Sequence, residues 1–187
     1  MRFLIYGINY FPELTGIGKY TGEMCEWLAK QGHDVTVITS NPYYPEWKIH
    51  NGYRNWFSRE MVSGVEVLRC PLYVPGRVTG KTRILQEISF IFSSFFYWFR
   101  MLFRRRYDVV ICISPPFHTC AFGIMYAKVK GGHLLCHIQD LQVDAAEKLQ
   151  RLKNRRFLKV LINLERFLLK SVDTVSTISE GMLAKIV

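Results

Sequence analysis

The sequence lacks the short motifs that mark several common kinds of catalytic and cofactor site. Neither a Gly-x-Ser-x-Gly nucleophile turn, nor a Walker phosphate loop, nor a zinc pattern occurs. The pair Gly16-x-Gly18 lacks the third glycine of the dinucleotide fingerprint. Asp34 stands at the start of a predicted strand, not its end, which also disfavours NAD. His133 and His137 lie on a predicted strand, where four residues span about 13 Å, too far for one metal ion. We therefore predict no cofactor and no metal site.

Acidic residues are scarce relative to basic ones. The chain has 15 Asp and Glu against 25 Lys and Arg, and its formal net charge is +10. A basic excess of this size implies an acidic partner, such as nucleic acid, anionic lipid or a phosphorylated substrate. No recognised nucleic-acid-binding module supports the first of these, so we expect no nucleic acid partner.

Cysteine pairs and a secretion signal are also missing. The five cysteines form an odd set without Cys-x-x-Cys, and most stand in apolar runs. We interpret them as small core residues in a reducing cytosol. The apolar run near the N-terminus is too short for a signal peptide, and no small-residue cleavage site follows it. These features favour a cytoplasmic location.

Apolar runs alternate with helical patterns along the chain, and 49% of the residues are apolar. This alternation is typical of an α/β fold with a doubly wound parallel sheet. No repeat or linker interrupts it, so we expect residues 1–187 to form one domain. Ser63-Gly64 indicates a short hairpin between Phe57–Met61 and Val65–Cys70. The strands expected in the parallel sheet are Phe3–Ile8, Val35–Thr39, Val109–Ile113, Leu134–Ile138 and Thr174–Thr177.

A glycine-rich turn connects the first strand to the first helix. Gly16, Ile17, Gly18 and Lys19 follow the apolar run and precede a helical pattern that continues to Lys30. Such a turn exposes unpaired backbone N–H groups at the positive end of the helix dipole. Glycines also allow a close approach of the backbone to a bound group. The pattern fits a site for a phosphate or a sugar hydroxyl, and it equally fits a tight turn without a ligand.

Other candidate residues follow the remaining strands. In doubly wound sheets, ligands bind at the carboxyl ends of the strands, near the point where the strand order reverses. The loop at residues 41–56 is rich in Tyr, Trp and Pro, and its aromatic rings either stack on a sugar or pack the loop itself. The candidate substrate-binding residues outside the glycine turn are Tyr10, Tyr43, Tyr44, His118, His137, Asp140 and Ser179.

The segment RILQEISFIFSSFFYWFRMLFRRR, residues 83–106, predicts a helix with an almost continuous apolar surface. Gln86, Glu87 and Arg100 interrupt it, which disfavours a membrane span of ~20 mostly apolar residues. The segment suits either a crossover helix buried on the sheet or a helix lying in a membrane interface. In the second case we expect docking by Phe95, Phe96, Trp98, Arg100, Arg104, Arg105 and Arg106.

Several of these segments together resemble a known family. The stretches NYFPELTGIGKYTGE, QGHDVTVIT, NPYYPEW, RCPLYVP, HIQDLQVDA and VSTISEGM extend through the whole chain. They resemble the first domain of the GT-B glycosyltransferases of the large retaining family that includes sucrose synthase and bacterial mannosyltransferases. The similarity is greatest to colanic acid biosynthesis glycosyltransferases of enteric bacteria.

The resemblance implies a fold and a mechanism. The chain would be the Rossmann-like N-terminal, acceptor-side half of a GT-B fold. A second domain, with the nucleotide site and a glutamate pair, would be absent, leaving the isolated chain inactive. Gly16 and Gly18 would form the loop near the donor phosphates, and His137 would be the catalytic histidine beside the donor sugar. Asp140 is a weaker candidate because the local motif varies.

The same resemblance implies the substrates and the location. The donor would be a nucleotide sugar and the acceptor a polyprenyl-diphosphate-linked saccharide used for exopolysaccharide. Transfer would retain the anomeric configuration and need no metal. The enzyme would be peripheral at the inner face of the cytoplasmic membrane, with the anionic membrane surface as a partner. The alternative is a non-catalytic, membrane-associated binding domain.

Overall fold

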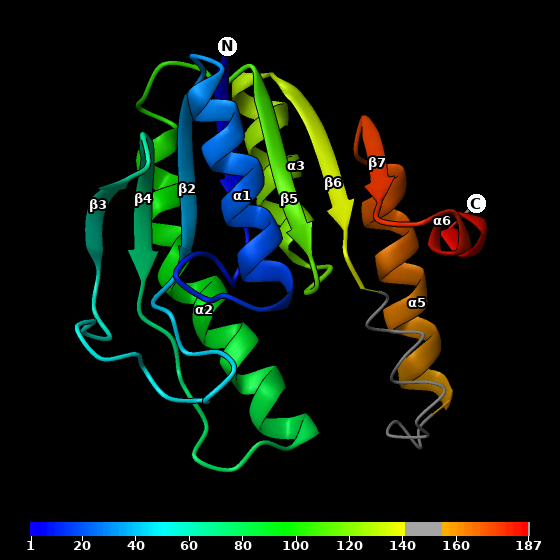
Figure 1. Ribbon diagram of the computed structural model, residues 1–187. Helices are drawn as coiled ribbons and strands as arrows, with labels where there is room; N and C mark the ends of the chain where they lie inside the picture. Colours follow the sequence, from blue (N-terminus) through cyan, green and yellow to red (C-terminus); the bar gives the residue numbers. More distant parts are fainter. Residues whose placement is uncertain (141–154, 187) are drawn as a thin grey trace.

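The computed structural model describes residues 1–140 and 155–186, and this part of the chain contains one seven-stranded sheet with helices on both faces (Figure 1). The strand order is β3-β4-β2-β1-β5-β6-β7. All neighbouring pairs are parallel except β3 and β4. The predicted parallel sheet is therefore confirmed. The strands are β1 (Arg2–Tyr6), β2 (Asp34–Ser40), β3 (Ser58–Val62), β4 (Val65–Cys70), β5 (Val109–Ser114), β6 (His133–Ile138) and β7 (Thr174–Thr177).

The helices cover the two faces of the sheet unequally. In Figure 1, α1 lies in front of the sheet, and α2 and α3 lie behind it. The helix α5 contacts α3, and the short α6 follows β7. This arrangement is the doubly wound α/β architecture that the sequence predicts. The helices are α1 (Gly16–Lys30), α2 (Gly80–Met101), α3 (Thr119–Lys130), α5 (Arg155–Lys170) and α6 (Glu180–Ile186).

Burial on both faces explains why the central strands are apolar without alternation. In β1, Leu4 and Ile5 are both fully buried, although successive side chains point to opposite faces. Leu4 belongs to the core beneath α2 and α3, and Ile5 belongs to the smaller core beneath α1. The sheet therefore separates two hydrophobic cores.

The predicted hairpin forms one edge of the sheet. Ser63 and Gly64 connect β3 to β4 and have φ angles of 50° and 81°. Two positive φ angles match the twist of a two-residue hairpin, and glycine adopts such an angle without steric cost. β3 is antiparallel to β4 and mostly solvent-exposed, so it is an edge strand.

The long apolar helix differs from the prediction at both ends. It begins at Gly80 because Thr79 and Thr82 form a capping box, in which the Thr79 hydroxyl accepts from the Thr82 N–H. It ends at Met101, so Arg104, Arg105 and Arg106 lie beyond it. In the described part of the chain, no helix is long and apolar enough to cross a membrane.

Two of the residues expected to dock on a membrane are engaged within the protein. Trp98 is only 4% exposed and packs against Tyr6, so its place in the docking set is a wrong prediction. The Arg104 guanidinium holds the Glu66 carboxylate with two hydrogen bonds, of 2.5 and 3.1 Å. Phe95, Phe96 and Arg100 are exposed, as that prediction requires. The end of the stretch HIQDLQVDA, after Asp140, lies outside the described residues.

Candidate functional site

The order of the strands reverses beside β1, because the chain continues from β1 to β2 on one side and later returns to β5 on the other. Gly7 follows β1 at this point. A Cβ at Gly7 would lie 3.0 Å from Ile113 Cβ, so the ends of β1 and β5 are packed closely. The loops after β1, β5 and β6 leave the sheet at the same end, which is formed by the carboxyl ends of the parallel strands. In doubly wound folds this is where ligands bind.

The helix α1 begins at this carboxyl end of the sheet, after the loop that follows β1. Thr15 occupies the N-cap position, but its side chain makes no capping hydrogen bond. The Thr15 hydroxyl therefore does not cap the first-turn N–H groups of α1. A helix end that binds phosphate needs these groups to be uncapped. Gly16 has a φ of +54°, and nothing lies within 4 Å of the position where a Cβ would stand. The predicted glycine turn thus presents open space at Gly16.

Gly18 has a different role from Gly16. A Cβ at Gly18 would lie 2.8 Å from Glu13 Cβ and 2.9 Å from Glu13 Oε2. The second glycine of the turn is therefore required for packing on Glu13. The other two residues of the turn, Ile17 and Lys19, are at least partly exposed to solvent. Ile17 is half-buried, and the Lys19 ammonium lies 3.9 Å from Glu23.

Glu13 is a site residue that the sequence prediction missed. Its side chain is 1% exposed, and Oε1 accepts hydrogen bonds from the N–H groups of Tyr43 and Tyr44, at 2.9 and 3.0 Å. Oε2 accepts from Asn9 Nδ2 at 2.8 Å. Burial raises the pKa of the Glu13 carboxyl against the opposing effect of these hydrogen bonds. One carboxylate therefore connects the loop after β1 to the loop after β2.

Arg69 supports the same loop from β4. Its guanidinium is fully buried and donates to the carbonyl oxygens of Phe11, at 2.7 Å, and Ser40, at 3.1 Å. It also pairs with Glu60 on the neighbouring edge strand. A buried arginine needs such partners, since an unpaired charge in the core is costly. Nothing in the sequence around Arg69 marks it as buried.

His118 lies at the end of the loop that follows β5, immediately before α3. Its Nε2 atom is buried, and no described residue offers it a hydrogen-bond partner. Burial lowers the pKa of His118 to about 4, so the ring is neutral at pH 7. A buried ring nitrogen without a hydrogen-bond partner is unusual in a folded protein. The substrate-binding role of His118 stays a prediction.

His137 is the penultimate residue of β6, one position before the end of that strand. Its Nδ1 shares a hydrogen bond of 2.9 Å with the hydroxyl of Ser176 on β7. Partial burial lowers the pKa of His137, which favours the neutral ring. The next loop residue, Gln139, contacts Thr21 Oγ1 of α1 at 3.4 Å. The end of β6 is therefore tied to the helix that starts at the glycine turn. Asp140 is exposed beside it.

The tyrosines expected to contact a sugar are placed differently. Tyr10 is buried in the core beneath α1, beside Cys25, and Tyr43 is buried against Trp47. The burial of Tyr43 contradicts a stacking role for its ring, and loop 41–56 packs on its own aromatics. The substrate-binding role of Tyr10, which lines the hollow beside α1, stays a prediction. Tyr44 remains 38% exposed. The Ser179 hydroxyl accepts from the Met182 N–H at 3.3 Å and thus caps α6.

A hollow of about 410 Å³ lies next to this site, between α1 and the β3–β4 hairpin. Its lining includes Glu23 and Glu26, which lie near Lys19 and Lys30. Carboxylates on a hollow disfavour a diphosphate. This leaves the carboxyl ends of β1, β5 and β6, near Gly16, His118 and His137, as the candidate site.

The fold defines a class of protein, the Rossmann-like α/β domains, in which ligands bind at the switch point of the sheet. The sequence matches the family described as Glycosyl transferase 4-like domain over residues 15–187, and the chain belongs to that family. It is 45% identical over 191 residues to a putative colanic acid biosynthesis glycosyl transferase, WcaI, of Escherichia coli strain K12. The match covers 99% of this chain and 46% of the relative, so the chain spans about half of that protein's length. Both findings relate the chain to glycosyltransferases.

Proposed function

We propose that this chain is the acceptor-side domain of a retaining, metal-independent glycosyltransferase of exopolysaccharide synthesis. The observation that supports the proposal is the sheet topology, because β1, β5 and β6, which precede Gly16, precede His118 and contain His137, all end at the same end of the sheet beside the switch point. The name of the relative, which concerns colanic acid biosynthesis, supports the choice of pathway class. Nucleotide binding is assigned to a second domain, as in similar GT-B enzymes.

In this proposal the donor is a nucleotide sugar and the acceptor is a saccharide carried on polyprenyl diphosphate. The uncapped first turn of α1 and the space over Gly16 suit the donor diphosphate. His137, neutral and oriented by Ser176, lies where a polar contact can stabilise an oxocarbenium-like transition state. The unpartnered His118 Nε2 is a hydrogen-bonding group for a sugar hydroxyl. The reaction takes place at the cytoplasmic face of the inner membrane, where that acceptor is exposed.

The test is transfer of radiolabelled sugar from nucleotide donors to lipid extracts, by the protein extended to the full length of its relative. His137→Ala should lower kcat by on the order of a hundredfold, the scale of losing one polar transition-state contact. His133→Ala is a matched control, because His133 lies on the same strand and bonds Thr174 of β7 at 2.8 Å, but at the amino end. Equal rates for wild type and His137→Ala would overturn the site. Binding of lipid without any sugar transfer would favour the non-catalytic alternative.

A further inference from the structure

The face of α2 that points away from the sheet is an exposed apolar surface. Its inward side chains, among them Phe90, Trp98 and Met101, are buried on the sheet. On the opposite side, exposed apolar side chains recur at helical spacing from Ile84 to Phe99, and Phe103 follows just beyond the helix. Eight such side chains are 41–77% exposed, namely Ile84, Leu85, Ile88, Phe92, Phe95, Phe96, Phe99 and Phe103.

This surface continues onto the neighbouring helix α3. The rings of Phe95 and Phe122 lie 6.2 Å apart and bridge the two helices. Met125 and Val129 of α3 are exposed as well. Figure 1 shows α2 and α3 on the face of the sheet opposite α1. We call the exposed side chains of these two helices, together with Phe103, the α2–α3 face. Exposed apolar side chains that gather over two neighbouring helices usually mark an interface.

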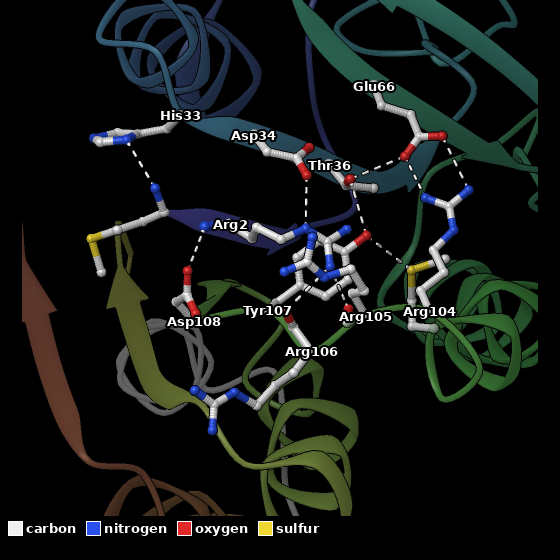
Figure 2. Close-up of polar contacts among 12 residues, drawn as sticks. Arg2, His33, Asp34, Thr36, Glu66, Arg104, Arg105, Arg106, Tyr107 and Asp108 are labelled. Carbon is white, nitrogen blue, oxygen red and sulfur yellow. Dashed lines mark hydrogen bonds and ion pairs between the residues drawn. The ribbon is translucent and has the colours of Figure 1, made fainter.

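The charges around the α2–α3 face are mostly of one sign. Residues 80–130 contain eight Lys and Arg but only two acidic residues, Glu87 and Asp108. The Asp108 carboxylate accepts from the Arg2 N–H at 2.7 Å, within the polar network at the amino ends of the strands (Figure 2). In the same network Arg104 is held by Glu66. Arg105 and Arg106 are exposed, and Figure 2 shows the Arg106 side chain directed away from the other labelled residues.

We propose that the α2–α3 face docks on an anionic phospholipid membrane, with Phe92, Phe99 and Phe103 inserted and Arg100, Arg105 and Arg106 at the lipid headgroups. An apolar helix face flanked by arginines fits the boundary between acyl chains and anionic headgroups. A second copy of this chain fits less well, because two such faces would bring like charges together.

The position of α2 connects this surface to the candidate site. α2 begins past the carboxyl ends of the strands, where the site lies, and its apolar residues extend from Ile84 at that end to Phe103 at the other (Figure 1). A membrane in contact with the whole face would therefore reach the end of the sheet where the candidate site lies. Membrane docking does not depend on the transfer reaction, so binding and activity can fail separately.

Co-sedimentation of the 187-residue chain with vesicles tests the proposal. Vesicles of phosphatidylglycerol and phosphatidylcholine should retain the chain, and those of phosphatidylcholine alone should retain much less. Bound protein should decrease as salt screens the arginines. Phe92→Gln with Phe103→Gln should weaken the partition coefficient by roughly tenfold or more, and both side chains are 77% exposed, so the core is preserved. Arg105→Gln with Arg106→Gln should weaken it by a similar factor, at about 1 kcal/mol for each arginine.

Two matched double variants serve as controls. Tyr20→Gln with Trp27→Gln removes exposed aromatics from α1, on the other face of the sheet. Lys48→Gln with Arg54→Gln removes the same number of exposed charges from the loop after β2. Both should bind vesicles as the wild type does. Equal losses in test and control variants would overturn the α2–α3 face. A dimer in light scattering that Phe92→Gln with Phe103→Gln dissociates, without vesicle binding, would overturn the membrane as its occupant.

Discussion

Glu13 and Gly18 are packed so closely that a Cβ at Gly18 would lie 2.8 Å from Glu13 Cβ. The glycine turn and the buried carboxylate are therefore one structural unit. Through Glu13 this unit also fixes Tyr43 and Tyr44, by way of their backbone N–H groups. The geometry of the glycine turn thus depends on a buried carboxylate that precedes it in the sequence.

The two glycines of the turn should respond differently to substitution. Gly18→Ala should destabilise the domain by about 1–3 kcal/mol, because the added methyl overlaps Glu13 in a filled space. Gly16→Ala should cost about 1 kcal/mol, because only its left-handed backbone angle resists a side chain. Gly16→Asn should be tolerated better, since asparagine adopts that angle more readily. Urea unfolding midpoints at constant slope measure these differences. Equal losses for both alanine variants would contradict the packing role of Gly18.

Loss of the Glu13 side chain should destabilise the domain. Glu13→Ala leaves the N–H groups of Tyr43 and Tyr44 and the amide of Asn9 without their acceptor, at a cost of roughly 2–4 kcal/mol. Glu13→Gln should cost less, because the amide oxygen still accepts from both tyrosine N–H groups. Glu23→Ala, on the exposed side of α1, is the control and should stay within about 0.5 kcal/mol of the wild type. If Glu13→Ala matches this control, Glu13 does not hold the two loops together.

The sequence predicted the sheet because a strand that is buried on both faces consists mainly of apolar residues. The parallel strands and the Ser63-Gly64 hairpin have local signals, an apolar run and a turn dipeptide, and all were confirmed. Glu13 and Arg69 were missed for the opposite reason. Their burial is made possible by partners 30 and 58 positions away, such as Tyr43 and Phe11, which no local pattern reveals.

The apolar helix shows a second limit of sequence patterns. A helix that is apolar all round does not indicate which side faces the sheet. Trp98 and Phe99 are adjacent in the sequence, yet Trp98 is buried in the core and Phe99 is exposed. Likewise, the three arginines after the helix look equivalent, but Glu66 engages only Arg104. The side chains available for docking depend on helix phase and on distant partners.

Stability should fall in mild acid because of His118. Burial lowers the pKa of this ring to about 4 in the folded protein, against about 6.5 when it is unfolded. Between these values the unfolded chain binds a proton that the folded chain does not, so the free energy of unfolding decreases as the pH falls from 6.5 to 4. The loss assigned to His118 is on the order of 3 kcal/mol. Unfolding of His118→Gln, measured by urea at several pH values, should lack this part of the decline. His33→Gln is the control and should keep it.

Ser176 should act as a positioning residue for His137. Its hydroxyl shares the 2.9 Å hydrogen bond with His137 Nδ1, which leaves Nε2 as the ring nitrogen for the substrate. In the full-length enzyme, Ser176→Ala should lower kcat by about fivefold, the value of one net hydrogen bond of about 1 kcal/mol, with little change in KM. Ser176→Thr keeps the hydroxyl and should restore most of the rate. In the His137→Ala background, Ser176→Ala should have no further effect, because the two residues act as one unit. Additive losses in the double variant would show that Ser176 acts by a route other than His137.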